Sequence, residues 1–319
     1  MFFVAVTSLI CVAQSGMSGV SSTPQVAIAS YPTGNPANSG NGPLKTDVDL
    51  VLVPVTVTDQ LGRLVLGLET ENFSVYDTSE QQAIRHFSRE DAPISLGVIF
   101  DTSYSMYRKI ERSRGAVVDF LRSANPEDEF FLIAFNDRPE LLVDYTSSVE
   151  EIQNRLAKVT PTGNTALLDA VYLGLNMMRR AHNERRALLI LSDGGDNHSR
   201  FNFREVWSVV EESNVQIYAM GIFDESPRTK EERAGPSLLN AITSVTGGRT
   251  FVIDNLKELG DAASRLSTEL RNQYVIAYRP SNLARDGRWH KISVRLAPPP
   301  NSPPLRVHAK AGYYAPVQR

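Results

Sequence analysis

Residues 94–105 of the chain read ISLGVIFDTSYS. The first seven form a nearly continuous apolar run, which is typical of a strand buried on both faces of a parallel sheet. Asp101 ends this run, and Ser103 and Ser105 follow it at alternate positions. Ligands of open α/β sheets bind at the carboxyl ends of the strands, so these three side chains are the first candidates for a functional site.

After this run, further apolar runs alternate with segments of helical length and periodicity. The predicted strands cover residues 130–135, 187–192, 215–222 and 249–253, and the predicted helices lie around residues 110–121, 166–180, 203–213, 236–245 and 256–270. Strands that alternate with helices in this way form a parallel sheet covered on both faces. We therefore predict a doubly wound α/β domain over residues 93–271.

Short strands are predicted on both sides of this domain. The N-terminal β segment, residues 46–92, shows valines at alternate positions in LVLVPVTVT and then three short candidates, LVLGL (64–68), NFSVYD (72–77) and AIRHFS (83–88), with no indication of a helix. Three more candidates follow in residues 272–319. A few isolated strands are not stable alone, so we predict that the two ends of the chain pair into one small β-sandwich.

The composition excludes two classes of protein. The 319 residues include 33 Lys and Arg against 36 Asp and Glu, for a net charge of −3. This balance offers no overall basic field for nucleic acid. Beyond the N-terminus, no apolar run is long enough to span a bilayer, so no stable membrane span is expected once the signal peptide is removed.

The N-terminus differs from the rest of the chain, because residues 1–44 contain no charged side chain. An apolar stretch at residues 2–13 followed by small polar residues predicts a signal peptide over residues 1–15 and a secreted, periplasmic or cell-surface location. The missing basic start and cleavage motif leave a buried first strand as the alternative. Cys11, the only cysteine, lacks the small preceding residues of a lipidation site. Residues 16–45 are expected to form a flexible linker.

Two more loops are expected at the same edge of the sheet as Asp101. Ser192 and Asp193 follow the apolar run ALLIL, and the sequence PTGNT, which ends at Thr165, opens the next predicted helix. Together the three loops supply two carboxylates and three hydroxyl groups. A hard divalent cation such as Mg²⁺ prefers oxygen ligands, and a vacant position on it favours a carboxylate from another protein.

At these residues the chain resembles the von Willebrand factor type A family, whose metal-ion-dependent adhesion site is written D-x-S-x-S, then Thr, then Asp. The order DTSYS, TGNT and LSDGGD follows this pattern, and GLETENFSVYD and the C-terminal NQYVIAYRP and AGYYAP resemble bacterial proteins related to this family. The resemblance covers nearly the whole chain after Thr46. It implies a Rossmann-like domain with Mg²⁺, Mn²⁺ or Ca²⁺ held, partly through water, by Asp101, Ser103, Ser105, Thr165 and Asp193.

The candidate site residues also have structural interpretations. Asp101, Asp193 and Thr165 could cap helices, and Ser103 and Ser105 could be turn residues. Asp196 and Asn197 are expected at a polar rim, the five histidines lack metal-ligand spacing, and the aromatic residues Trp207, Trp289, Tyr313 and Tyr314 are expected to pack. Tyr104 stands where the family commonly has Gly, so it could narrow the approach to the metal or contact a ligand.

From these features we predict an exported, adhesion-type module that binds a Glu or Asp carboxylate of a partner protein through a divalent metal. The alternative is a metal-independent, extracytoplasmic interaction scaffold of the same fold. An enzyme is not expected, because the sequence has no G-x-S-x-G elbow, phosphate-binding loop or dinucleotide fingerprint. A metal-dependent hydrolase is the least favoured interpretation, because no general base is identifiable.

Overall fold

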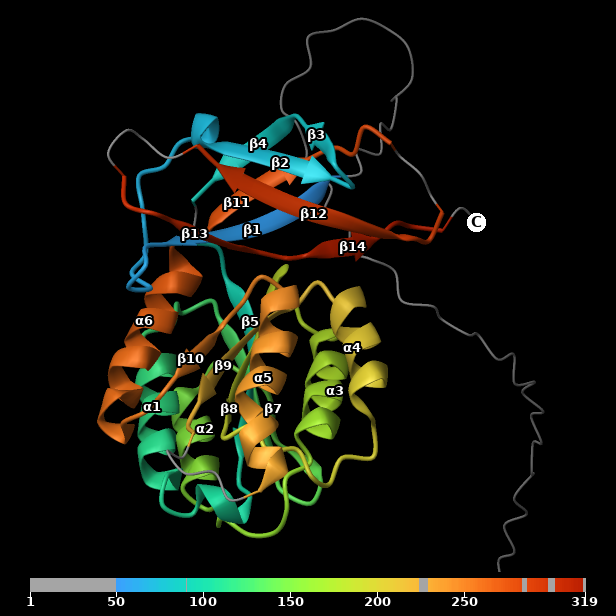
Figure 1. Ribbon diagram of the computed structural model, residues 1–319. Helices are drawn as coiled ribbons and strands as arrows, with labels where there is room; N and C mark the ends of the chain where they lie inside the picture. Colours follow the sequence, from blue (N-terminus) through green and yellow to red (C-terminus); the bar gives the residue numbers. More distant parts are fainter. Residues whose placement is uncertain (1–49, 90, 224–228, 283–285, 298–301, 318–319) are drawn as a thin grey trace, which may run out of the picture.

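The computed structural model describes residues 50–89, 91–223, 229–282, 286–297 and 302–317 (Figure 1). These residues form an α/β domain built on one six-stranded sheet, with a β-sandwich of two four-stranded sheets beside it. The predicted signal peptide and the predicted linker lie outside the described residues.

The sheet of the α/β domain has the strand order β10-β9-β8-β5-β6-β7. Its strands are β5 (Ile94–Asp101), β6 (Glu129–Phe135), β7 (Pro139–Thr146), β8 (Arg185–Ser192), β9 (Gln216–Gly221) and β10 (Thr250–Val252). All neighbouring pairs are parallel except β6 and β7, which are antiparallel. β5 lies between β8 and β6, and each of its residues is buried. The apolar run at residues 94–100 is therefore part of a central strand, as predicted.

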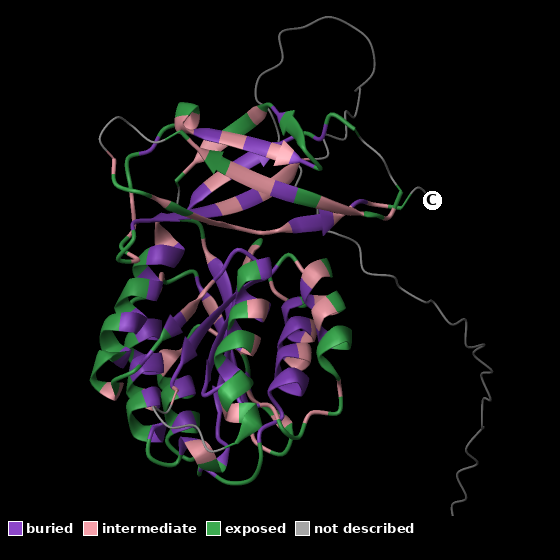
Figure 2. Ribbon diagram, in the orientation of Figure 1, coloured by how far each residue is buried: buried purple, intermediate pink, exposed green. Residues whose placement is uncertain are grey.

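Helices cover both faces of this sheet (Figures 1 and 2). One hydrophobic core lies under α1 (Ile110–Arg122), α2 (Val149–Leu156) and α6 (Leu259–Arg271), and it contains Val98 and Phe100 of β5. The other core lies under α3 (Leu167–Met178), α4 (Phe203–Glu212) and α5 (Lys230–Val245). Alternate side chains of a strand point to opposite faces, so β5 contributes to both cores. The doubly wound fold is confirmed.

Three elements of the α/β domain differ from the prediction. β7 and α2 were not predicted, because β7 is an edge strand with a mostly half-exposed surface and α2 has only 8 residues. α5 begins at Lys230 rather than at Pro236, which lies inside the helix. Its start is fixed by Thr229 and Glu232, whose side chains each accept a hydrogen bond from the other residue's backbone N–H group.

The N-terminal β segment also differs in detail. Residues 64–68 do not form a strand: only Leu64 forms an isolated bridge with Thr58, and Gly67 turns the chain with a φ of 83°. A short 3₁₀ helix, η1 (Thr70–Asn72), follows where no helix was expected. The segment still contributes four strands, which are β1 (Val51–Thr58), β2 (Phe73–Asp77), β3 (Glu80–Gln82) and β4 (Ile84–Ser88).

The two ends of the described chain pair in the sandwich, as predicted. One sheet has the order β13-β1-β11-β4 and the other β14-β12-β2-β3. The C-terminal strands are β11 (Tyr274–Tyr278), β12 (Trp289–Leu296), β13 (Arg306–Ala309) and β14 (Gly312–Tyr314). β1 lies between β11 and β13, and Val53, Val55 and Val57 pack with Tyr274 and Ile276 in the sandwich core.

Buried polar contacts join the sandwich to the α/β domain. Glu269 of α6 is fully buried and lies 2.6 Å from the Arg249 guanidinium, which also donates to the Gly62 carbonyl. The Gln273 amide donates to Thr56 Oγ1 of β1 and to the Tyr218 hydroxyl of β9. α6 leads directly into β11, so these contacts fix the point at which the chain returns to the sandwich.

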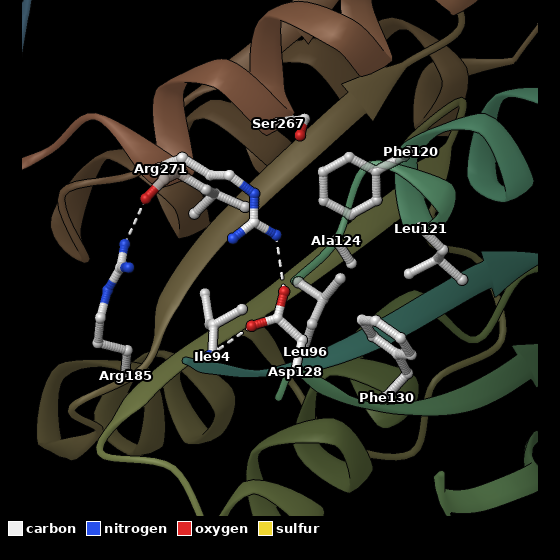
Figure 3. A pocket seen from close by; sticks show the side chains of 11 residues that line it. Ile94, Leu96, Phe120, Leu121, Ala124, Asp128, Phe130, Arg185, Ser267 and Arg271 are labelled. Carbon is white, nitrogen blue, oxygen red and sulfur yellow. Dashed lines mark hydrogen bonds and ion pairs between the residues drawn. The ribbon is translucent and has the colours of Figure 1, made fainter. Parts of the chain in front are cut away.

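An ion pair and a hydrogen bond join α6 to the large sheet near the same junction (Figure 3). Arg271 of α6 lies 2.7 Å from the fully buried Asp128 carboxylate, and Arg185 donates to the Leu270 carbonyl. The cavity between these groups and Phe120 has a volume of only about 10 Å³. Because that is about the space of one water molecule, it is packed interior rather than a ligand site.

One histidine of the sandwich has a strongly shifted pKa. His308 of β13 pairs with Thr56 of β1, and its Nε2 atom lies 3.1 Å from Thr58 Oγ1. Burial lowers the pKa of His308 from 6.5 to about 4, and the charges of Arg249 and Arg306 act in the same direction. The folded chain therefore keeps this imidazole neutral where an unfolded chain would bind a proton.

We expect the free energy of unfolding to fall as the pH drops from 6.5 toward 4, because only the unfolded state gains this proton. With about 1.4 kcal/mol per pKa unit and a reduction for partial exposure, the loss from pH 7 to pH 5 is about 1–2 kcal/mol. Urea unfolding of the wild type and H308Q at both pH values measures it. The variant should lose less stability, and equal losses would contradict the assignment to His308.

Candidate metal site

Two of the predicted site residues lie together at the carboxyl edge of the large sheet. Asp101 ends β5, and Asp193 directly follows β8, the neighbouring parallel strand, in which Leu191 pairs with Phe100. Asp101 is fully buried and Asp193 is 4% exposed. This edge lies at the end of the α/β domain that is remote from the sandwich (Figure 1).

The loop after β5 holds the Asp101 carboxylate from two sides. Its Oδ1 atom accepts a hydrogen bond of 2.8 Å from the Ser103 backbone N–H, and its Oδ2 atom accepts one of 2.5 Å from the Ser192 hydroxyl. The Ser103 and Ser105 hydroxyl oxygens lie 3.0 Å apart. The loop is anchored by Met106, which is fully buried in the 3₁₀ helix η2 (Tyr104–Met106). The two serine hydroxyls therefore lie next to each other beside a fixed carboxylate.

The loop that carries Thr165 is bound between the other two loops. Toward the first, Thr162 N–H donates to the Thr102 carbonyl and Tyr104 N–H to the Gly163 carbonyl. Toward the last, Thr165 N–H donates to the Asn197 side chain, and Asn197 N–H donates back to the Thr165 carbonyl. The structure thus brings all three predicted loops to one edge, and Asn197 does lie at their rim.

Gly163 is required for this arrangement. Its φ of 76° lies in the left-handed region, and a Cβ atom there would lie 2.5 Å from an Asp137 carboxylate oxygen. That carboxylate accepts hydrogen bonds from both the backbone and the side-chain nitrogen of Asn164. Only glycine combines this backbone conformation with so close a neighbour.

The capping interpretations do not hold for the three residues concerned. The N-cap residues of α1 and α3 are Lys109 and Ala166, neither of which makes a side-chain capping hydrogen bond, and α4 is capped by Asn202. Asp101, Asp193 and Thr165 therefore cap none of these helices. The Thr165 side chain makes no hydrogen bond among the described residues, although Thr165 is only 4% exposed.

The electrostatics of the site are set by two nearby buried carboxylates. Burial, followed by the negative charge of Asp193, raises the pKa of Asp101 to about 7, although the hydrogen bonds from Ser103 and Ser192 act in the opposite direction. One cation faces the pair. The Lys109 ammonium is 3.4 Å from Asp193 Oδ2 and 3.0 Å from the Ile222 carbonyl, and Lys109 is 6% exposed. With both carboxylates ionised, these three groups carry a net charge of −1.

Ser192 and Lys109 had no role predicted from the sequence. Ser192 directly precedes Asp193 in the motif LSDGGD, so its position in the sequence was an indication that it belongs to the site. Lys109 was detectable only indirectly: a cation at the N-terminus of α1 opposes the helix dipole, which indicates a partner elsewhere. Two of its contacts are with Asp193 and the Ile222 carbonyl, 84 and 113 positions along the chain, and no local pattern predicts such contacts.

Tyr104 points outward from the site. Its side chain is 72% exposed, and its ring stacks on that of Tyr107, which is 65% exposed, with 6.3 Å between the ring centroids. Met106 between them is fully buried. The two tyrosines thus form an exposed aromatic pair next to the paired serines, and Tyr104 is available to a ligand.

The donor set fits a hard divalent cation. No group of three or more His, Cys, Asp or Glu side chains suited to a metal occurs among the described residues. The edge instead offers two carboxylates and three hydroxyl groups, and the Lys109 ammonium can offset only one of the two carboxylate charges. Oxygen ligands of this kind suit Mg²⁺, which keeps some of its waters in proteins.

A mainly parallel sheet with a D-x-S-x-S loop at its carboxyl edge defines the class of von Willebrand factor type A domains. Residues 96–195 match the sequence profile of the von Willebrand factor type A domain, so this part of the chain belongs to that family. The described helices are all too short or too polar to cross a membrane.

Among curated proteins, the chain is similar to inter-alpha-trypsin inhibitor heavy chain H4 from Homo sapiens, with 26% identity over 40% of this chain and 15% of the relative. Heavy chain 4 from Mus musculus is 31% identical over 35% of this chain and 14% of the relative. The matches thus span about a seventh of these relatives. A von Willebrand factor type A structure from Catenulispora acidiphila shares the fold, with a TM-score of 0.50 and 11% identity over 85% of this chain and 76% of that one.

The Lys109–Asp193 contact can be tested by its effect on stability. Removing one partner of a buried ion pair leaves an unbalanced charge, so K109M should lower the free energy of unfolding by about 3 kcal/mol in chelator. In a D193N background the same substitution should cost at least about 1 kcal/mol less. Urea unfolding of the four proteins gives the difference.

R108M is the matched control, because Arg108 is exposed and precedes Lys109 directly. It should leave stability within about 0.5 kcal/mol of the wild type. If K109M costs the same in both backgrounds, its effect arises from contacts other than the one with Asp193.

Proposed function

We propose that the α/β domain binds a divalent metal at its carboxyl edge and, through that metal, an acidic side chain of a partner protein. The observation that carries this proposal is the pair of buried carboxylates, Asp101 and Asp193, at neighbouring strand ends beside three hydroxyl-bearing residues. The proposed ligands, in part through water, are Asp101, Ser103, Ser105, Thr165 and Asp193. Mg²⁺ is the preferred ion, with Mn²⁺ and Ca²⁺ as alternatives.

The chain's own residues would set the strength of this contact. Only two of the five proposed ligands are anionic, and Lys109 offsets one of these charges. A metal held there, when bound, supplies a centre of positive charge that attracts an external carboxylate. The edge lies at the end of the α/β domain that is remote from the sandwich, so the sandwich does not cover it (Figure 1).

We further propose that the protein is exported and acts in adhesion-type contacts rather than in catalysis. The uncharged N-terminal segment with its apolar stretch at residues 2–13 supports export. Neither the matched domain family nor the heavy-chain relatives carry a name that indicates a catalytic activity.

One observation favours a second function, that of a metal-independent interaction scaffold. The Lys109 ammonium already lies 3.4 Å from Asp193, so it supplies part of the positive charge that a metal would bring. On this alternative the edge is a structural salt bridge, and partner binding does not change when divalent ions are removed.

Calorimetric titration of Mg²⁺ and Mn²⁺ into the full chain tests the metal site. We expect one saturable site in the wild type and at least tenfold weaker binding in D101N and D193N, because each substitution removes one of the two anionic ligands. D261N is the control, since Asp261 is an exposed carboxylate in the first turn of α6.

Circular dichroism and thermal unfolding establish that each variant is folded. A folded wild type that binds neither ion, or carboxylate variants that bind as well as D261N, would overturn the metal site and favour the scaffold. Binding that is lost in D101N and D193N alone supports the site and justifies a search for acidic partners with and without chelator.

A further inference from the structure

A groove of about 260 Å³ lies beside the candidate metal site. One wall comes from β7 and the turn before it, where Arg138, Glu140 and Leu142 occupy alternate positions. The other wall comes from Arg155 at the end of α2 and from Lys158 to Thr160 in the segment that follows. The proposed metal site uses none of these side chains.

The groove carries a net positive charge above an apolar base. Three cations, Arg138, Arg155 and Lys158, face a single carboxylate, Glu140, and all four residues are exposed. Arg155 Nε donates to the Leu142 carbonyl. The side chains of Arg138 and Lys158 make no hydrogen bond or ion pair within the described part of the chain. Ala134, Phe135, Leu142 and Val159 provide apolar surface between them.

Thr102 connects this groove to the candidate metal site. It lines the groove and directly follows Asp101 in the chain. Its backbone N–H and its hydroxyl both donate to the Phe135 carbonyl, and its own carbonyl accepts from Thr162 N–H. The groove is therefore contiguous with the candidate metal site, and these hydrogen bonds fix the backbone that joins the two.

We propose that this groove, which we call the cationic groove, binds an acidic peptide segment of the partner protein that the metal site engages. The inference rests on the proposed function. Carboxylates of the segment pair with Arg138, Lys158 and Arg155, and an apolar side chain packs on the base between them. Charge complementarity favours an acidic peptide, because the groove carries three cations and one carboxylate in a chain whose net charge is −3.

A nucleic acid fits the groove less well than an acidic peptide. A polyanion needs a continuous run of cations along its phosphates, whereas Glu140 interrupts the wall of the groove. The apolar base also offers nothing to a phosphate backbone, but it accommodates a Leu or Ile side chain next to acidic ones.

The experiment uses fluorescence anisotropy of a labelled peptide, Glu-Glu-Leu-Glu-Glu-Leu, with the full chain at low salt. We expect R138E/K158E to weaken peptide binding at least fivefold, both in chelator and in Mg²⁺, because two attractive charges become repulsive. The matched control is K257E/R265E, which makes the same change of charge at exposed cations near and on α6, and it should change binding less than twofold.

The two proposals fail in different ways in this experiment. D101N should remove the gain in affinity that Mg²⁺ gives. Absence of any Mg²⁺ effect in the wild type counts against the metal site alone. The groove is overturned if K257E/R265E weakens binding as much as R138E/K158E, if the wild type does not bind the peptide, or if a labelled dT10 oligonucleotide binds as tightly as the peptide. R138Q/K158Q, a milder change, should give an intermediate affinity and guards against misfolding of the reversal variant.

Discussion

Asp101 and Asp193 are held close together in a buried environment by the parallel pairing of β5 and β8. Like charges at short range in such an environment repel each other strongly, and hydrogen-bond donors and a cation nearby reduce this repulsion. Ser192 and the Ser103 backbone donate to Asp101, and the Lys109 ammonium lies against Asp193. Since Lys109 cancels only one of the two charges, a divalent ion would leave the site with a net charge of +1. An acidic side chain from outside restores neutrality, so metal binding and partner binding are expected to support each other.

The direction of the parallel strands places the sandwich and the candidate metal site at opposite ends of the molecule (Figure 1). β1 lies between β11 and β13, so the α/β domain is inserted between N-terminal and C-terminal strands that must meet. The parallel strands then run away from the sandwich, and their carboxyl ends lie at the far edge (Figure 1). Gln273 and the Glu269–Arg249 pair hold the junction, where their contacts reach both β1 and β9. Ligand contacts at one end therefore leave the sandwich free for other contacts.

In the large sheet, sequence patterns predicted the strands that are buried on both faces and missed the half-exposed edge strand β7. β5, β6, β8 and β9 appear as apolar runs because both faces of the sheet are covered, whereas the edge strand β7 has no such run. Pro236 suggested a helix start, but the capping pair of Thr229 and Glu232 begins α5 earlier. Asp101 and Asp193 were predictable because strand ends converge in parallel sheets. Lys109 was not, because its partners are distant in the chain.

The cationic groove lay beyond sequence analysis for a related reason. Arg138 was in no predicted element, and Arg155 and Lys158 belong to a helix and a loop that periodicity did not indicate. Such a surface matters for the choice of partner. A metal ion accepts any accessible carboxylate, so it provides affinity with little discrimination. A groove that requires acidic and apolar side chains at fixed positions next to that carboxylate adds the discrimination, because partners that lack them leave three cations without counter-charges.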